Sequence, residues 1–176
     1  MSEDWDGISQ GPYWDSVTAC RPPEDHIATS ARWRSAELDL HGHYLSQIPD
    51  QVWTMTHLTE LHLYLNKLTV LPAEIGQLTA LTWLSIADNE LSELPDSIGQ
   101  LRHLTRLDAE NNQLTTLPPA MTALTELTEL NLSGNNLATI PAWLADLPAL
   151  TTVYAARNPL EDVPQSITSR FRIRRA

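Results

Sequence analysis

The chain has 176 residues and a net charge of −11, with 22 acidic and 11 basic side chains. Its length suits a single domain, and no apolar run reaches the roughly 18 residues of a membrane span, so we expect no membrane contact. A chain with this negative charge would repel the phosphate backbone of a nucleic acid, so we expect no nucleic-acid partner. The single cysteine, Cys20, leaves no internal disulfide, and a cytoplasmic location is expected.

The N-terminal segment divides into a tail and a predicted helix. Residues 1–21 are acidic, with no apolar stretch typical of a secretory signal, and we interpret them as a flexible acidic tail. Residues 22–34 are expected to form a helical cap, since Pro23 suits a first helical turn and acidic residues precede arginines. The apolar residues expected to cover the first repeat are Ile27, Ala31 and Trp33.

From residue 35 to 169 one 23-residue frame occurs six times: L-x-x-L-x-L-x-x-N-x-L-x-x-L-P-x-x-I-x-x-L-x-x. A unit this short cannot bury its own apolar side, so six neighbours must stack to share one continuous core. Two further columns keep the same period. The first is His43, Asn66, Asn89, Asn112, Asn135 and Asn158, and the second is Pro49, Pro72, Pro95, Pro118, Pro141 and Pro164.

Each repeat predicts one strand and one short convex segment. In T-E-L-H-L-Y, Leu61 and Leu63 point inward while the residues between them point outward, which is the alternation of a half-buried strand. The asparagine amides are expected to satisfy backbone groups of adjacent turns. We expect parallel strands near 37–39, 60–62, 83–85, 106–108, 129–131 and 152–154, and turns or short helices near Ala73–Gln77 and Asp96–Gln100.

The frame resembles a known family. The repeat L-T-E-L-H-L-Y-L-N-K-L-T-V-L-P-A-E-I-G-Q-L-T-A is similar to the leucine-rich repeats of the Ras-pathway scaffold, the LAP polarity proteins, the plant intracellular Ras-group-related proteins and bacterial stand-alone arrays, over about residues 35–170. The resemblance implies an α/β repeat solenoid: a horseshoe with a parallel concave sheet and a convex side of short helices or turns. It also implies protein binding through the concave face, no cofactor and no shared catalytic residues.

The C-terminal end departs from the frame. Arg170 occupies a leucine position, and residues 170–176 are interpreted as a basic C-terminal cap. Phe171 and Ile173 alternate with arginines there, so we expect a final half-strand that closes the core.

Outward positions of the central strands predict a binding surface. Aromatic residues fall on adjacent strands beside a charged strand, and Trp, Tyr and Arg are enriched at binding hot spots. The alternative is that Trp83 simply packs over its cross-strand neighbours. We expect a non-catalytic interaction module, a scaffold or signalling regulator, whose protein partner has a basic surface. The predicted binding residues are His62, Tyr64, Leu65, Trp83, Arg106, Asp108 and Glu110.

The alternative function is that of an enzyme or a secreted effector with a site at Asp39, His62 and Ser85. These residues fall on three consecutive predicted strands, in the order of a nucleophilic triad. No Gly-rich elbow precedes Ser85, and an open face supplies neither an oxyanion hole nor exclusion of water. A metal site from His41, His62 and Asp39 has no H-x-x-x-H or paired-cysteine spacing in its favour. Neither a catalytic nor a metal site is therefore predicted.

Overall fold

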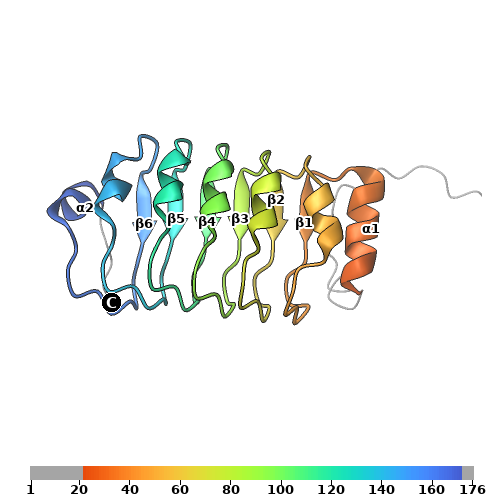
Figure 1. Cartoon of the computed structure of the whole chain (residues 1–176), viewed down its shortest axis with the longest axis horizontal. Coiled ribbons are helices and arrows are strands. Elements are labelled where there is room, and N and C mark those ends of the chain that lie inside the picture. The colour runs from red at the N-terminus through yellow and green to blue at the C-terminus, as the bar shows by residue number, and fades with distance from the viewer. Residues whose placement is uncertain (1–21, 172–176) are drawn as a thin grey trace, which may run out of the picture.

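The computed structural model describes residues 22–171 (Figure 1). Its core element is a six-stranded parallel sheet whose strands are paired in chain order. Each strand lies in register with the same position of the next repeat, so that Leu61, for example, lies opposite Leu84. The predicted strand positions and the parallel pairing are confirmed. The strands are β1 (Glu37–Asp39), β2 (Glu60–His62), β3 (Trp83–Ser85), β4 (Arg106–Asp108), β5 (Glu129–Asn131) and β6 (Thr152–Tyr154).

The convex side consists of one-turn 3₁₀ helices, each of which begins directly after a proline of the repeat. Proline has a fixed φ and no N–H to donate, so it suits this entry position. The predicted segments Ala73–Gln77 and Asp96–Gln100 are confirmed. The five helices are η2 (Asp50–Thr54), η3 (Ala73–Gln77), η4 (Asp96–Gln100), η5 (Pro119–Ala123) and η6 (Ala142–Asp146).

One continuous apolar core lies between the sheet and these helices. Leu84, Leu107 and Leu130 of the inward strand column are fully buried, as are Ile75 and Ile98 of the convex column. The inside–outside assignment made from the sequence is therefore confirmed. Because each repeat packs only on its neighbours, stability accumulates along the row of strands in Figure 1.

The asparagine column forms a buried hydrogen-bond ladder. Asn112 donates from Nδ2 to the carbonyl oxygens of Ile86 (2.9 Å), Ala109 (3.3 Å) and Glu110 (3.2 Å). Its Oδ1 accepts from the N–H of Leu91 at 3.0 Å. Each amide therefore ties its own turn to the preceding repeat, which confirms the predicted structural role of the column.

A threonine column forms a second ladder that the leucine frame alone does not reveal. Each hydroxyl donates to the carbonyl oxygen of the equivalent residue one repeat earlier, as Thr105 does to Thr82 at 2.9 Å. Thr59, Thr82, Thr128 and Thr151 make the same bond at 2.9–3.2 Å. The two ladders flank β2 to β6 and tie each of these strands to the preceding repeat.

The N-terminal end is covered by helix α1 (Pro23–Trp33). Ile27 is buried against the first repeat, and the Ser30 hydroxyl donates to the Glu37 carbonyl at 3.2 Å. The expectation that Ala31 and Trp33 join this cover is wrong. Ala31 is exposed and Trp33 is 72% exposed, because the helix packs through only one side and ends at Trp33. The tail, residues 1–21, lies outside the described residues.

Helix α2 (Gln165–Arg170) covers the C-terminal end of the array, and the predicted half-strand would begin directly after it at Phe171, whose backbone is extended (φ −120°, ψ 144°). Pro164 starts the helix, and Ile167 and Phe171 are buried in the core. Arg170 replaces the expected leucine because its guanidinium donates to the carbonyl oxygens of Leu147 (2.7 Å) and Leu150 (3.1 Å). The second residue of the predicted half-strand, Ile173, lies outside the described residues.

Candidate functional site

The outward positions of the six strands form one solvent-facing surface, here called the sheet face. The register places Glu60, Trp83 and Arg106 side by side on β2, β3 and β4. The next outward column holds His62, Ser85 and Asp108 in the same order. Two of the predicted binding residues, Trp83 and Arg106, are thus direct neighbours.

Aromatic and cationic groups run across β1–β4 in a connected row. The Arg106 guanidinium carbon lies 3.9 Å from the centre of the Trp83 ring, which is cation–π geometry. On the other side of Trp83, the His62 ring packs edge-on at 4.6 Å and 89°. Tyr64 lies 6.5 Å from His62 and stacks on His41 at 4.6 Å and 6°. The half-buried indole of Trp83 is therefore held in place from two sides.

His62 faces the sheet face, but its neighbours cover it so well that only 6% of its surface is exposed. Its Nε2 lies 3.3 Å from Oε1 of Glu37 and 3.6 Å from Oε2 of Glu60. A partner would meet the two half-buried glutamates and the Trp83 ring before it reached this imidazole.

Leu65 lies at the turn that follows β2 and is 53% exposed. Its φ is +57°, in the left-handed region that disfavours branched side chains. The same turn holds Gly42, Asp88, Asn111 and Gly134 in four other repeats, all residue types that tolerate this conformation, and Arg157 in the sixth. Leu65 thus combines a large exposed apolar group with a strained backbone.

Asp108 and Glu110 lie at and just beyond the end of β4 and differ in their surroundings. Burial raises the pKa of Asp108, partly offset by a hydrogen bond from the Glu110 N–H at 3.2 Å. The Glu110 carboxylate accepts from Nδ2 of Asn131 at 3.0 Å and pairs with the Arg157 guanidinium. Both carboxylate oxygens of Glu110 therefore already have partners within the chain, and fewer of its acceptor sites are open to a binding partner.

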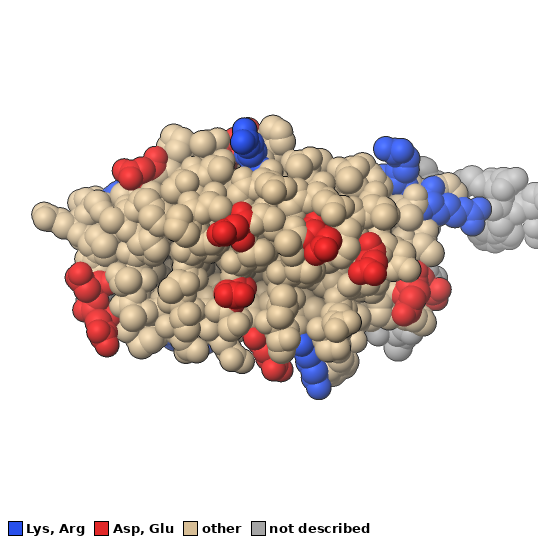
Figure 2. All heavy atoms as spheres, viewed as in Figure 1, with Lys and Arg blue, Asp and Glu red and all other residues tan. Residues whose placement is uncertain are grey.

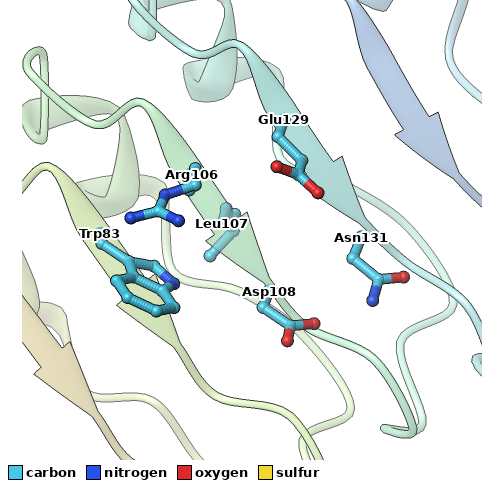
Figure 3. A pocket seen from close by; sticks show the side chains of 6 residues that line it. All are labelled: Trp83, Arg106, Leu107, Asp108, Glu129 and Asn131. Atoms are coloured by element: carbon cyan, nitrogen blue, oxygen red, sulfur yellow. The ribbon is translucent and has the colours of Figure 1, made fainter.

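A shallow hollow of about 120 Å³ lies beside Trp83 on the sheet face (Figure 3). Arg106 on β4 extends toward Trp83 on β3, while Glu129 and Asn131 come from β5 on the opposite side. An aromatic wall, a guanidinium and two carboxylates suit a small polar or cationic side chain. The hollow is lined by Trp83, Arg106, Leu107, Asp108, Glu129 and Asn131.

On the face drawn in Figure 2, the acidic side chains are separated by broad uncharged areas and the basic ones lie mostly at the rim.

The contacts of Asp39, His62 and Ser85 do not make a catalytic triad. Oδ1 of Asp39 lies 2.8 Å from Nδ1 of His41. Nε2 of His62 faces Glu37 and Glu60 instead. Among residues 22–171, no hydrogen bond joins His62 to Asp39 or to Ser85. The three side chains share a column without sharing contacts.

Sequence reasoning missed several residues of this surface. Glu37 and Glu60 around His62, and Glu129 and Asn131 around the hollow, all occupy outward strand positions. The same alternation that pointed to Trp83 could have found them, but single charged residues on a strand look like ordinary solvated positions.

A family model described as a leucine-rich repeat region matches residues 38–154, and the chain therefore belongs to the leucine-rich repeat family. Proteins of this family are generally protein-interaction modules. No match to the chain was found among curated proteins. No helix within residues 22–171 is long and apolar enough to cross a membrane.

Solved structures with the same fold include bacterial proteins. InlP of Listeria monocytogenes is 28% identical with a TM-score of 0.68, over 78% of this chain and 38% of its own. A leucine-rich repeat protein of Leptospira interrogans is 26% identical with a TM-score of 0.61, over 93% and 54%. The leucine-rich repeat domain of the type III effector XopL is 26% identical with a TM-score of 0.69, over 83% and 56%. This chain thus spans roughly two fifths to just over half of each of these chains.

Proposed function

We propose that the chain is a non-catalytic protein-interaction module that binds a partner through the sheet face over β2–β4. The observation that carries the proposal is the Trp83 indole, half-buried between Arg106 and His62 at the centre of the face. A large aromatic side chain fixed in place before binding loses little conformational entropy on contact, which is the behaviour of a binding anchor.

The partner is proposed to carry a basic surface. Glu37 and Glu60 flank Trp83 on one side, and Asp108 and Glu129 line the hollow on the other. A lysine or arginine of the partner that entered the hollow would meet the carboxylates of Asp108 and Glu129, while Arg106 already lies over the Trp83 ring. The wider role that fits such a module is a scaffold or regulator in signalling within the cytoplasm, the compartment suggested by the single cysteine.

The second candidate role is that of an exported effector, since the leucine-rich repeat domain of a type III effector is among the similar structures. That likeness concerns the repeat domain and adds no catalytic group to this chain. The contacts of Asp39, His62 and Ser85 also lend catalysis no support, so binding remains the proposed activity in either setting.

The test begins with affinity capture from native lysate, followed by measurement of the dissociation constant for the captured protein. We expect Trp83→Ala to weaken binding by about 30-fold, the value of a hot spot near 2 kcal/mol. Trp33→Ala is the matched control, because this tryptophan is 72% exposed on α1 at the end of the array. Equal affinity of the Trp83 variant and the wild type would refute the proposed site.

A further inference from the structure

Three side chains on β1 and β2 bring potential metal ligands together on the sheet face. Glu37 lies opposite Glu60 in the strand register, and His62 is the next outward residue after Glu60 on the same strand. One ligand atom from each residue lies within 4.8 Å of the other two. These three residues come from two adjacent strands held by the same ladder, so their backbone positions are fixed by the fold.

We propose that Glu37, Glu60 and His62 bind a divalent transition-metal ion, with Zn²⁺ as the ion their chemistry suits best. Tetrahedral Zn²⁺ with metal–ligand distances of about 2.1 Å separates its ligand atoms by roughly 3.4 Å. The Nε2 of His62 lies 3.3 Å and 3.6 Å from the two carboxylate oxygens, close to that separation. Three protein ligands leave one position for water or for a group of a partner.

The charges at this place favour a cation. Two carboxylates face each other across adjacent strands, an arrangement that like-charge repulsion opposes. Within residues 22–171, the only ion-pair contacts of Glu37 and Glu60 are those with His62. The nearby cations are engaged elsewhere, Arg106 over Trp83 and Lys67 over Tyr44.

The imidazole is oriented as a ligand should be. His62 is 6% exposed, and its ring is fixed by edge-on contacts with Trp83 at 4.6 Å and Tyr64 at 6.5 Å. A ligand held on a strand by packed neighbours needs little rearrangement to bind a metal. One nitrogen and two oxygens favour Zn²⁺ over Mg²⁺ or Ca²⁺, which prefer larger sets of oxygen ligands.

This set shares only His62 with the group of His41, His62 and Asp39 that the sequence brings to mind. Asp39 and His41 are paired with each other at 2.8 Å. The actual cluster depends on Glu37 and Glu60, whose side chains meet only because β1 and β2 are in register. The competing interpretation is a metal-free cluster in which His62 alone bridges the two glutamates, and the following experiment separates the two.

The experiment is calorimetric titration of the full chain with ZnCl₂ near neutral pH, together with thermal unfolding. We expect one Zn²⁺ per chain and a Tm increase of roughly 5 °C or more when free Zn²⁺ is at about 100 times its Kd. Co²⁺ should give the intense visible absorption of a four-coordinate ion, while Mg²⁺ and Ca²⁺ should leave the Tm unchanged.

Variants locate the ion. His62→Gln and Glu60→Gln should each weaken Zn²⁺ binding by more than about tenfold. Glu60 is half-buried, so its variant remains informative if the His62 variant folds poorly. The matched control is His103→Gln, which removes an exposed histidine that pairs with a single glutamate, Glu126, at 3.2 Å. Glu129→Gln, which changes the hollow on β5 and not the surroundings of His62, should retain Zn²⁺ binding, and this distinguishes the metal site from the partner-binding proposal.

Two results would overturn the inference. The first is the absence of a Zn²⁺-dependent heat or Tm change in the wild-type chain. The second is unchanged binding by the Glu60→Gln variant, or loss of binding only in Cys20→Ser, which would assign the ion to another part of the chain.

Discussion

At the residue scale, the turn after each strand places one residue in the left-handed region, and four of the six repeats have glycine, aspartate or asparagine there. The equivalent residues in all six repeats have positive φ, and Leu65 is the one with an apolar side chain. Asn111 shows how a polar residue fits there, since its amide donates to Asp88 of the preceding repeat at 2.7 Å. Leu65 therefore costs stability at a position where it also exposes apolar surface to a partner.

Leu65→Asn should raise the free energy of unfolding by about 1 kcal/mol, because asparagine tolerates the left-handed region better than leucine. The same change should weaken partner binding if Leu65 belongs to the proposed surface. Chemical denaturation gives the first value and titration with the captured partner the second. Leu65→Ala is the control, because alanine lacks the local side-chain hydrogen bonding that lets asparagine tolerate positive φ, and it should not show the gain in stability. Equal stability of the two variants would contradict the strain argument.

Asp108 gives a prediction about pH. Because burial raises its pKa above the ordinary 3.8, the stability contributed by its neutral form is fully present below that pH and is lost as pH rises through the folded pKa. At neutral pH the folded chain therefore holds an unfavourable charge. Asp108→Asn should raise the Tm at about pH 7, and the difference from wild type should close at about pH 3. A difference of equal size at both pH values would show that ionisation of Asp108 is not the cause.

At the element scale, the short strands owe their register to side-chain ladders on both flanks. Each strand has only three residues, so the amide bonds of the asparagines and the hydroxyl bonds of the threonines supply much of the contact between repeats. The frame made the asparagine ladder predictable. The threonine ladder was equally periodic, but threonine is common on exposed strands and its bond is made to a carbonyl one repeat away.

Asn112→Ala should lower the free energy of unfolding by about 1–3 kcal/mol, because it leaves buried carbonyl groups and the Leu91 N–H without a partner. Asn136→Ala is the matched control, since this asparagine is exposed, and its effect should stay within about 0.5 kcal/mol. Denaturant unfolding of both variants measures the difference. Similar losses from the two changes would mean that the ladder contributes little to stability.

The sequence predicted the fold more fully than the site, for a physical reason. A fixed period repeats one local geometry, so the place of Leu107 follows from that of Leu84. Site contacts join different columns and distant repeats, as in the pairing of Glu110 with Arg157. The burial of His62 likewise depends on three neighbours from three strands, and no single column reveals it.

The ends show the same limit, because the repeat pattern stops there. A proline and an acidic first turn were enough to predict α1, but which of its residues pack on β1 depends on the tilt of the helix. At the other end, Arg170 looked like a failed leucine position. Its guanidinium instead donates to the carbonyl oxygens of Leu147 and Leu150. Arg170 therefore ends the leucine pattern and also gives hydrogen-bond partners to backbone groups at the end of the array.

At the scale of the whole molecule, charge and shape act together. Residues 35–169 carry 16 acidic and 4 basic side chains, a net charge of −12, on an elongated array. An extended acidic body attracts a basic partner over a distance set by ionic screening, which speeds encounter more than it strengthens the final complex. The sheet face adds local acidic groups beside Trp83, so long-range attraction and the proposed contact site coincide.

The rate of association with a basic partner should therefore fall steeply as salt is raised from low to physiological ionic strength, while the dissociation rate changes much less. Glu129→Gln, in the hollow beside Trp83, should lower the association rate and flatten its dependence on salt. Glu161→Gln is the control of equal charge change, since this exposed glutamate follows β6 near the end of the array. Stopped-flow or surface-based kinetics would measure both rates. If the two variants behaved alike, the attraction would come from total charge alone, and the acidic groups of the sheet face would have no special part in guiding the partner to Trp83.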